Sequence, residues 1–210
     1  GECEAVWKQI AERFAKYDEH LIFESMNEES DGTYDGDPNK EYYANLNQYN
    51  QIFVDTVRGT GEKNTHRWLL VPGWNTNIEY TVGDYGFEMP TDEKCSAGES
   101  RMMVSVHYYD PWDYCGIEDL KTILWGEYGD NLIEVNGFPK MNKAKWGDES
   151  YLDDLFSRMQ EKFVKNDIPV IIGEYGCIDK SSAYADFAGQ IQGNRAYWDG
   201  YVAGKAASIR

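Results

Sequence analysis

The sequence predicts an α/β fold in which helices cover a parallel sheet. Three observations support this prediction. Segments with a helical spacing of apolar residues alternate with short apolar runs along the chain. The short runs are almost continuously apolar, which is typical of parallel strands buried on both faces. A chain of 210 residues can bury a sizeable core, and no repeat or low-complexity linker divides it, so we expect a single domain over residues 1–210.

The first part of the chain predicts two helices and two strands. A helical spacing of apolar residues covers residues 4–17, and the apolar run at 21–23 predicts a short strand. The acidic loop at 31–41 lacks the spacing of a calcium-binding EF-hand, so we expect a solvated loop. A second helix follows, and residues 67–77 predict a strand and then a loop. The apolar face of this helix should carry Leu46, Tyr49, Phe53 and Val57.

The second part of the chain predicts two more strands. Residues 78–100 and 112–149 look irregular, and the run at 101–111 between them predicts a strand and a loop. An amphipathic helix then ends before Pro169, since proline cannot continue a helix. Residues 168–176 predict the fourth strand, and residues 194–210 predict a closing helix.

The composition excludes several classes of function. The formal net charge of −17 disfavours a nucleic-acid partner, and no apolar stretch is long enough to span a membrane. The four cysteines have no CxxC spacing, so we expect neither a metal site nor a redox motif. Their even number allows one disulfide, for which Cys95 with Cys115 is a candidate. The aromatic content of 15% suits either core packing or a surface that stacks on sugars.

Two glutamates carry the chemical prediction. Glu28 ends an apolar run in HLIFESMNEES (20–30), and Glu174 ends another in IPVIIGEYG (168–176). Reactive groups of parallel α/β proteins gather just past the carboxyl ends of the strands. Two carboxylates on separate strands suit glycoside hydrolysis, which needs one acid and one nucleophile or base. The alternative is structural, because a single glutamate in such a place often caps a helix or pairs with a cation.

Three further polar residues fit the same interpretation. Asn27 could donate a hydrogen bond to a sugar hydroxyl. His107 and Tyr109 lie two residues apart at a third strand end, so their side chains point to the same face. Tyr109 could hydrogen-bond the nucleophile while His107 holds a sugar hydroxyl. A lone histidine is more often structural, and that alternative stays open.

Several segments together resemble the cellulases of glycoside hydrolase family 5, in particular the broad-specificity endoglucanases of gut and rumen bacteria. The resemblance covers essentially the whole chain. Its most specific parts are the Asn-Glu pair, the Gly-Glu-Tyr motif and the His-Tyr-Tyr strand between them. The matching segments are FESMNE (23–28), NQYNQIFVDTVRGTG (47–61), RWLLVPGWNTN (67–77), FEMPTD (87–92), VSVHYYDPWDY (with its core at 106–114), KWGDES (145–150) and IPVIIGEYG (168–176).

The resemblance implies a (β/α)8 TIM barrel, of which this chain should hold about strands four to seven with flanking helices. It also implies retaining hydrolysis of β-1,4-glucans, with Glu28 as acid/base and Glu174 as nucleophile. Asn27, His107 and Tyr109 would then bind the sugar next to the cleaved bond, and no cofactor or metal is needed. On weaker grounds, three loop tryptophans would line the cleft: Trp74, Trp112 and Trp146.

The resemblance leaves alternatives open. The chain should be a fragment, so a complementary chain or segment could complete the barrel. It could also be an inactive fragment that still binds carbohydrate, or the same machinery could act on xylan, xyloglucan or mannan. A polymeric substrate implies a secreted protein, although no targeting segment is visible.

Overall fold

The structure is a computed structural model that describes residues 1–32, 37–118 and 121–209. The middle of the acidic loop at 31–41, which the sequence predicts to be solvated, lies outside the described residues. The chain divides into two compact units. The first unit comprises Gly1–His107 and Lys162–Gly173, and the second comprises Tyr108–Glu161 and Glu174–Arg210. Among the described residues, no helix has both the length and the apolar character needed to cross a membrane.

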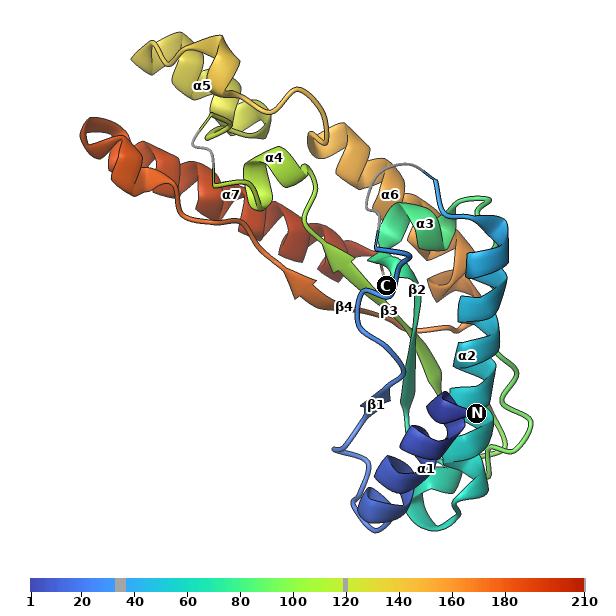
Figure 1. Ribbon diagram of the computed structural model, residues 1–210. Coiled ribbons are helices and arrows are strands. Elements are labelled where there is room, and N and C mark those ends of the chain that lie inside the picture. The colour runs from blue at the N-terminus through green and yellow to red at the C-terminus, as the bar shows by residue number, and fades with distance from the viewer. Residues whose placement is uncertain (33–36, 119–120, 210) are drawn as a thin grey trace. The chain divides into compact units, whose positions relative to one another are not determined.

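A four-stranded parallel sheet forms the centre of the first unit, which confirms the predicted fold class (Figure 1). The strands follow one another in chain order across the sheet. They are β1 (Phe23–Glu24), β2 (Leu69–Asn77), β3 (Met102–Tyr108) and β4 (Val170–Tyr175). In the sheet, Phe23 of β1 lies opposite Leu69 of β2, which in turn lies opposite Met102 of β3. The last residues of β3 and β4 belong to the second unit.

Burial differs between the strands. Every residue of β3 is buried, and so is most of β2, as expected for strands covered on both faces. The prediction of two buried faces is wrong for β4, whose residues are half-buried or exposed. The reason is the position of β4 at one end of the strand order, where it has a single neighbour.

The helices of the first unit are α1 (Glu2–Phe14), α2 (Lys40–Gly59) and the short α3 (Ile78–Val82). Helix α2 begins at Asn39, whose side-chain oxygen accepts hydrogen bonds from two N–H groups of the first turn. Its buried face carries Tyr43, Leu46, Asn50, Phe53, Val54 and Val57. The expectation that Tyr49 packs in this core is wrong, because Tyr49 lies beside the buried stripe and is exposed.

Two buried arginines tie the first unit together. Arg58 makes two hydrogen bonds to the carboxylate of Asp92, at 2.8 and 3.0 Å. Arg67 is fully buried and donates to the side chain of Asn64. Its other N–H groups donate to backbone carbonyls between the end of α1 and the start of β1, which belong to Phe14, Tyr17, Asp18 and Leu21. The segment that leads into β1 is therefore fixed by one side chain.

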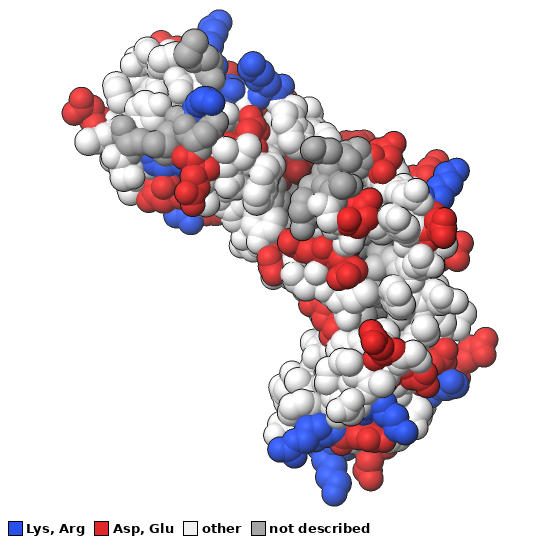
Figure 2. Space-filling view, viewed as in Figure 1, with Lys and Arg blue, Asp and Glu red and all other residues white. Residues whose placement is uncertain are grey.

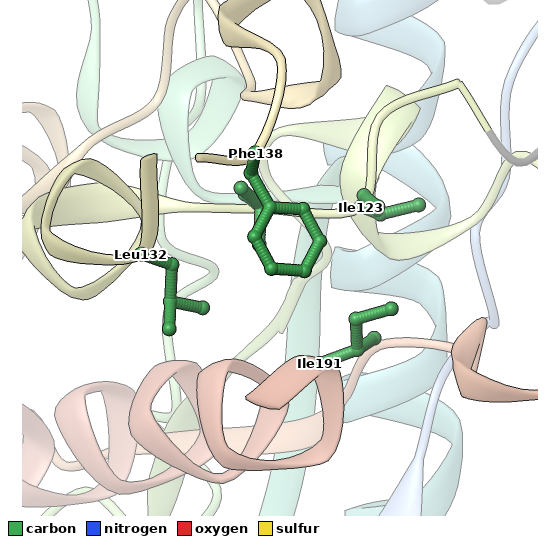
Figure 3. Packing of buried hydrophobic residues seen from close by; sticks show 5 residues of the cluster. Ile123, Leu132, Phe138 and Ile191 are labelled. Carbon is green, nitrogen blue, oxygen red and sulfur yellow. The ribbon is translucent and has the colours of Figure 1, made fainter. Parts of the chain in front are cut away.

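The second unit contains α4 (Trp112–Cys115), α5 (Gly126–Asn136), α6 (Glu149–Lys162, whose last residue lies in the first unit) and α7 (Ala188–Ser208). Figure 3 shows one of its cores, built from Ile123, Leu124, Leu132, Phe138 and Ile191. A second group of rings surrounds Tyr108, which stacks on Trp198 and meets Phe156 edge-on. Helices α4 and α5 fall in the stretch that looks irregular in the sequence, and α7 begins six residues before the predicted start at 194.

All four cysteines are free, so the candidate disulfide between Cys95 and Cys115 is absent. Cys95 lies in a partly exposed turn of the first unit. Cys115 is buried at the end of α4, and this burial raises the pKa of its thiol. Burial also raises the pKa of the Cys177 thiol to about 12, so both buried thiols are protonated and unreactive at neutral pH.

Candidate active site

Glu28 and His107 form a hydrogen-bonded pair in the first unit. Glu28 follows β1, and its Oε1 atom lies 2.8 Å from Nδ1 of His107 near the end of β3. The imidazole is buried, whereas the carboxylate of Glu28 is partly exposed. A buried ring on a rigid strand can hold one carboxylate oxygen in place while the other side of the group faces solvent.

The turn that carries Glu28 is supported by an irregularity in β2. Glu28 has a positive φ of 50°, and its N–H donates to Oγ1 of Thr76 at 3.0 Å. Asn75 and Thr76 also have positive φ, and the register of β2 against β3 shifts between Pro72 and Asn77. This irregular part of β2 places the Thr76 hydroxyl within hydrogen-bond distance of the turn after β1. The sequence contains no simple signal for this role of Thr76.

Glu174 and Tyr109 form a second pair, in the second unit. The hydroxyl of Tyr109 donates to Oε2 of Glu174 at 2.8 Å. Glu174 is exposed on β4. The ring of Tyr109 also meets Trp112 edge-on, with 6.1 Å between the ring centroids. The hydrogen bond that the sequence suggests between Tyr109 and Glu174 is therefore present.

The two pairs are connected through one strand end. His107 and Tyr109 are separated by Tyr108 alone, whose side chain enters the aromatic core of the second unit. Gly173, which precedes Glu174, lies next to His107 in the sheet, because a Cβ atom at Gly173 would be in van der Waals contact with Nε2 of His107 at 3.4 Å. Each pair thus joins a carboxylate at one strand end to a hydrogen-bonding group from the end of β3.

The other predicted residues lie in different settings. Asn27 is exposed in the turn after β1. Trp74 is buried within β2, so its predicted loop location is wrong, because β2 continues to Asn77. Trp112 is exposed as the first residue of α4 rather than on a loop, and its ring lies over Gly116. Trp146 is exposed on the loop before α6.

The electrostatic setting is acidic. Figure 2 shows Asp and Glu side chains recurring over the visible face, in keeping with the net charge of −17. Within either unit taken alone, the described residues contain no group of three His, Cys, Asp or Glu side chains that could hold a metal ion. Such a surface favours a neutral ligand over an anionic one.

Comparisons with known proteins identify the family of the chain. Residues 2–206 match the family described as "Cellulase (glycosyl hydrolase family 5)". Endoglucanase A of Paenibacillus barcinonensis is 54% identical over 181 residues, which is 84% of this chain and 43% of that protein. A xyloglucan-specific endo-beta-1,4-glucanase of Bacteroides ovatus is 37% identical over 82% of this chain and 32% of its own length.

Solved structures give the same result. The family 5 xyloglucanase from Paenibacillus pabuli, in complex with ligand, is 48% identical and has a TM-score of 0.87. The alignment covers 99% of this chain and 55% of that structure. The chain therefore spans about half the length of the relatives it matches, or less. Because the family match covers nearly every residue, the chain belongs to glycosyl hydrolase family 5, the cellulase family.

Proposed function

We propose that this chain carries the catalytic carboxylates of a retaining endo-β-1,4-glucanase. Glu28 would be the acid/base and Glu174 the nucleophile. The observation that carries the proposal is two carboxylates at the carboxyl ends of strands of one parallel sheet, Glu28 in the turn after β1 and Glu174 near the end of β4. The first is hydrogen-bonded to His107 near the end of β3, and the second to Tyr109 directly after it. Retaining hydrolysis uses two such carboxyl groups about 5–5.5 Å apart.

The first chemical step breaks the glycosidic bond. A carboxylate oxygen of Glu174 attacks the anomeric carbon and forms a glycosyl ester. Glu28, in its protonated form, gives its proton to the glycosidic oxygen, which leaves with the departing sugar. The Tyr109 hydroxyl bonds Oε2 of Glu174, so it can orient the nucleophile for this attack.

The second step releases the bound sugar. Glu28, now a carboxylate, takes a proton from water, and the water oxygen attacks the anomeric carbon. The ester bond breaks, and Glu174 regains its carboxylate. The buried imidazole of His107 lies within hydrogen-bond distance of Oε1 of Glu28, so it can keep that carboxyl group oriented through both steps.

The substrate class that we propose is a neutral β-1,4-linked glucan. The acidic surface disfavours anionic polysaccharides, and the relatives are named endoglucanases. Xyloglucan is the second candidate, because two of the similar proteins are named xyloglucanases. A polymeric substrate of this size also leads us to propose action outside the cell.

We further propose that a complementary segment or chain completes the sheet. β1 and β4 lie at the two ends of the strand order, so, among the residues that the structure describes, each presents one edge without a neighbouring strand. Native mass spectrometry tests this point. A bound second polypeptide, or a longer parent chain that folds as one barrel, would support the proposal. A monodisperse, stable 24.2 kDa monomer that hydrolyses β-glucan would contradict it.

The test of function is hydrolysis of carboxymethylcellulose and xyloglucan by the chain and by two variants, Glu28→Gln and Glu174→Gln. We expect each variant to lose at least about a hundredfold in rate, because it removes a proton-transfer group or the nucleophile. Glu134→Gln on the exposed face of α5 is the matched control and should keep full activity. Full activity of Glu174→Gln would contradict the assignment. Binding of cello-oligosaccharides without turnover by the unaltered chain would favour an inactive binding fragment.

A further inference from the structure

The register shift in β2 lies next to the turn after β1. Regular pairing with β3 stops after Pro72 and resumes with Asn77, which lies opposite His107. Strand β2 has more residues in this interval than β3, so residues 73–76 form a bulge. Bulges bend a strand and redirect its side chains, and they are frequent next to active sites. Thr76 is the last residue of this bulge.

The backbone of the bulge has an unusual conformation. Asn75 and Thr76 have positive φ angles of 52° and 51°, and Glu28 in the neighbouring turn has one of 50°. Non-glycine residues rarely adopt this left-handed region, and for a β-branched residue such as threonine it is an outlier. Outliers of this kind persist only where the surrounding contacts hold them, and they gather at functional sites. The contacts of Thr76 therefore indicate what this conformation achieves.

Two hydrogen bonds join the bulge to the turn. The N–H of Glu28 donates to Oγ1 of Thr76 at 3.0 Å. The N–H of Asn75 donates to the carbonyl of Glu29 at 2.9 Å. Thr76 is fully buried, so water does not compete for its hydroxyl. The two bonds run in opposite directions between neighbouring residues of the two segments, and together they fix the backbone of Glu28 beside β2.

The bulge is itself anchored to helix α3. The side-chain oxygen of Asn77, directly after Thr76, accepts a hydrogen bond from the N–H of Tyr80 in α3. The carbonyl of Asn77 accepts a second bond from the Thr81 hydroxyl at 2.6 Å. Thr76 lies between these contacts and the turn after β1, so a displacement of its hydroxyl would disturb several hydrogen bonds at once. A catalytic group is oriented precisely only by supports that are themselves held in this way.

Glu28 is thus held at two points. His107 lies 2.8 Å from Oε1 of its side chain, and Thr76 binds its backbone. We propose that Thr76 is a positioning residue for Glu28: the threonine hydroxyl fixes the backbone so that the carboxyl group meets the glycosidic oxygen. Proton transfer needs hydrogen-bond distance, so a small displacement of the donor lowers the rate. The proposal rests on the assignment of Glu28 as acid/base.

The first experiment compares two substrates that differ in their need for a proton. Cellotetraose has a sugar as leaving group and needs general acid catalysis, whereas 2,4-dinitrophenyl cellobioside releases a stable phenolate without it. Thr76→Val replaces the hydroxyl by a methyl group of similar size, and we expect it to lower kcat/KM on cellotetraose about ten- to a hundredfold. On the aryl substrate kcat/KM should stay within about twofold. There kcat and KM should fall together, because release of the bound sugar still needs Glu28 as base.

Further variants separate positioning from a loss of stability. Thr76→Ser keeps the hydroxyl and should retain at least about half of the activity on cellotetraose. Thr60→Val removes a threonine hydroxyl at the end of α2, which accepts from the Asn64 amide and donates to the Val57 carbonyl. It should lower stability and leave the ratio of the two kcat/KM values unchanged. Thr76→Ala also lacks the hydroxyl and replaces Thr76→Val in the comparison if the valine variant does not fold.

The second experiment does not depend on turnover. Amide hydrogen exchange, followed by NMR, reports on the Glu28 N–H that donates to Thr76. We expect this N–H to exchange at least about tenfold faster in Thr76→Val than in the unaltered chain or in Thr76→Ser. Equal exchange in all three proteins would overturn the proposal, and so would equal losses of kcat/KM on the two substrates, or no loss on either. Absence of hydrolysis of both substrates by the unaltered chain would refute the proposed function, and hydrogen exchange would then decide alone whether Thr76 fixes the turn.

Discussion

Replacing Arg67 by methionine should destabilise the first unit strongly. The guanidinium makes five hydrogen bonds, one to the Asn64 side chain and four to backbone carbonyls. The four carbonyls belong to the backbone between the end of α1 and the start of β1, so they cannot turn away to find other donors. At about 1 kcal/mol for each hydrogen bond lost, the free energy of unfolding should fall by about 4 kcal/mol. This is a large share of the total of about 5–15 kcal/mol for a domain.

Urea unfolding followed by circular dichroism measures this change. With a slope of about 2 kcal/mol per molar urea, a loss of about 4 kcal/mol lowers the midpoint by about 2 M. Arg13→Met is the matched control, because Arg13 is an exposed arginine in the last turn of α1. The control should stay within about 0.5 kcal/mol of the unaltered chain. A loss below about 1 kcal/mol for Arg67→Met would refute the idea that this side chain fixes the entry to β1.

Three further predictions concern the second unit, two of them in and near the pair formed by Tyr109 and Glu174 and one at a helix start. Tyr109→Phe removes the hydroxyl that donates to Glu174, and kcat/KM on a soluble β-glucan should fall about ten- to a hundredfold with the fold intact. Gly116→Ala would place a Cβ atom 2.3 Å from the Trp112 ring, so the ring must move, and calorimetry with cellotetraose should detect about three- to tenfold weaker binding. Asp148→Ala should cost about 1 kcal/mol in the free energy of unfolding at pH 7, because its carboxylate accepts N–H groups of the first turn of α6.

The effect at Asp148 should depend on pH in a defined direction. The hydroxyl of Ser150, followed by backbone N–H groups, holds the pKa of this carboxyl below its usual value. The stability it contributes is therefore present above the unfolded pKa of about 3.9 and is lost as pH falls through the lower folded pKa. The difference between Asp148→Ala and the unaltered chain should shrink over that acidic range. A constant difference down to the lowest pH at which both fold would contradict this account.

Matched controls exist for the other two predictions. Gly204→Ala on α7 adds a Cβ atom with no neighbour within 4 Å, so it should leave sugar affinity unchanged. Tyr175→Phe changes an exposed tyrosine next to Glu174 and should keep activity if only the Tyr109 hydroxyl matters. Equal losses of kcat/KM on a soluble β-glucan in Tyr109→Phe and Tyr175→Phe would indicate a general disturbance of β4 rather than the loss of one hydrogen bond.

The fold class was predictable because the strands are short apolar runs between periodic helices. The four parallel strands are part of the (β/α)8 barrel that is the fold of family 5. Helix α5 was not predictable from the sequence, because it contains two glycines, which disfavour a helix, and because few of its apolar residues are buried. The assignment of Tyr49 to the core failed for another reason. A tyrosine at the edge of an apolar stripe can either pack in the core or face solvent, and the sequence pattern does not distinguish the two positions.

The candidate site was predictable in its residue types but not in its contacts. The glutamates stand out because polar residues directly follow apolar runs, and Tyr109 shares a strand face with His107. The bond between His107 and Glu28 joins residues 79 positions apart, and no local pattern encodes such a pairing. The role of Thr76 depends on positive φ angles in β2, which non-glycine residues rarely adopt. Such features arise only when the sheet has formed.

Covalent trapping of the nucleophile is the sharpest test of whether Glu174 attacks the anomeric carbon. A 2-deoxy-2-fluoro-cellobioside with a good leaving group forms the glycosyl ester quickly and loses it slowly. Peptide mass spectrometry then locates the added sugar. We expect one label per chain, on the peptide that contains Glu174, and no label in Glu174→Gln. A label on another carboxylate, or turnover of β-glucan with no trapped ester and inverted product, would contradict this assignment.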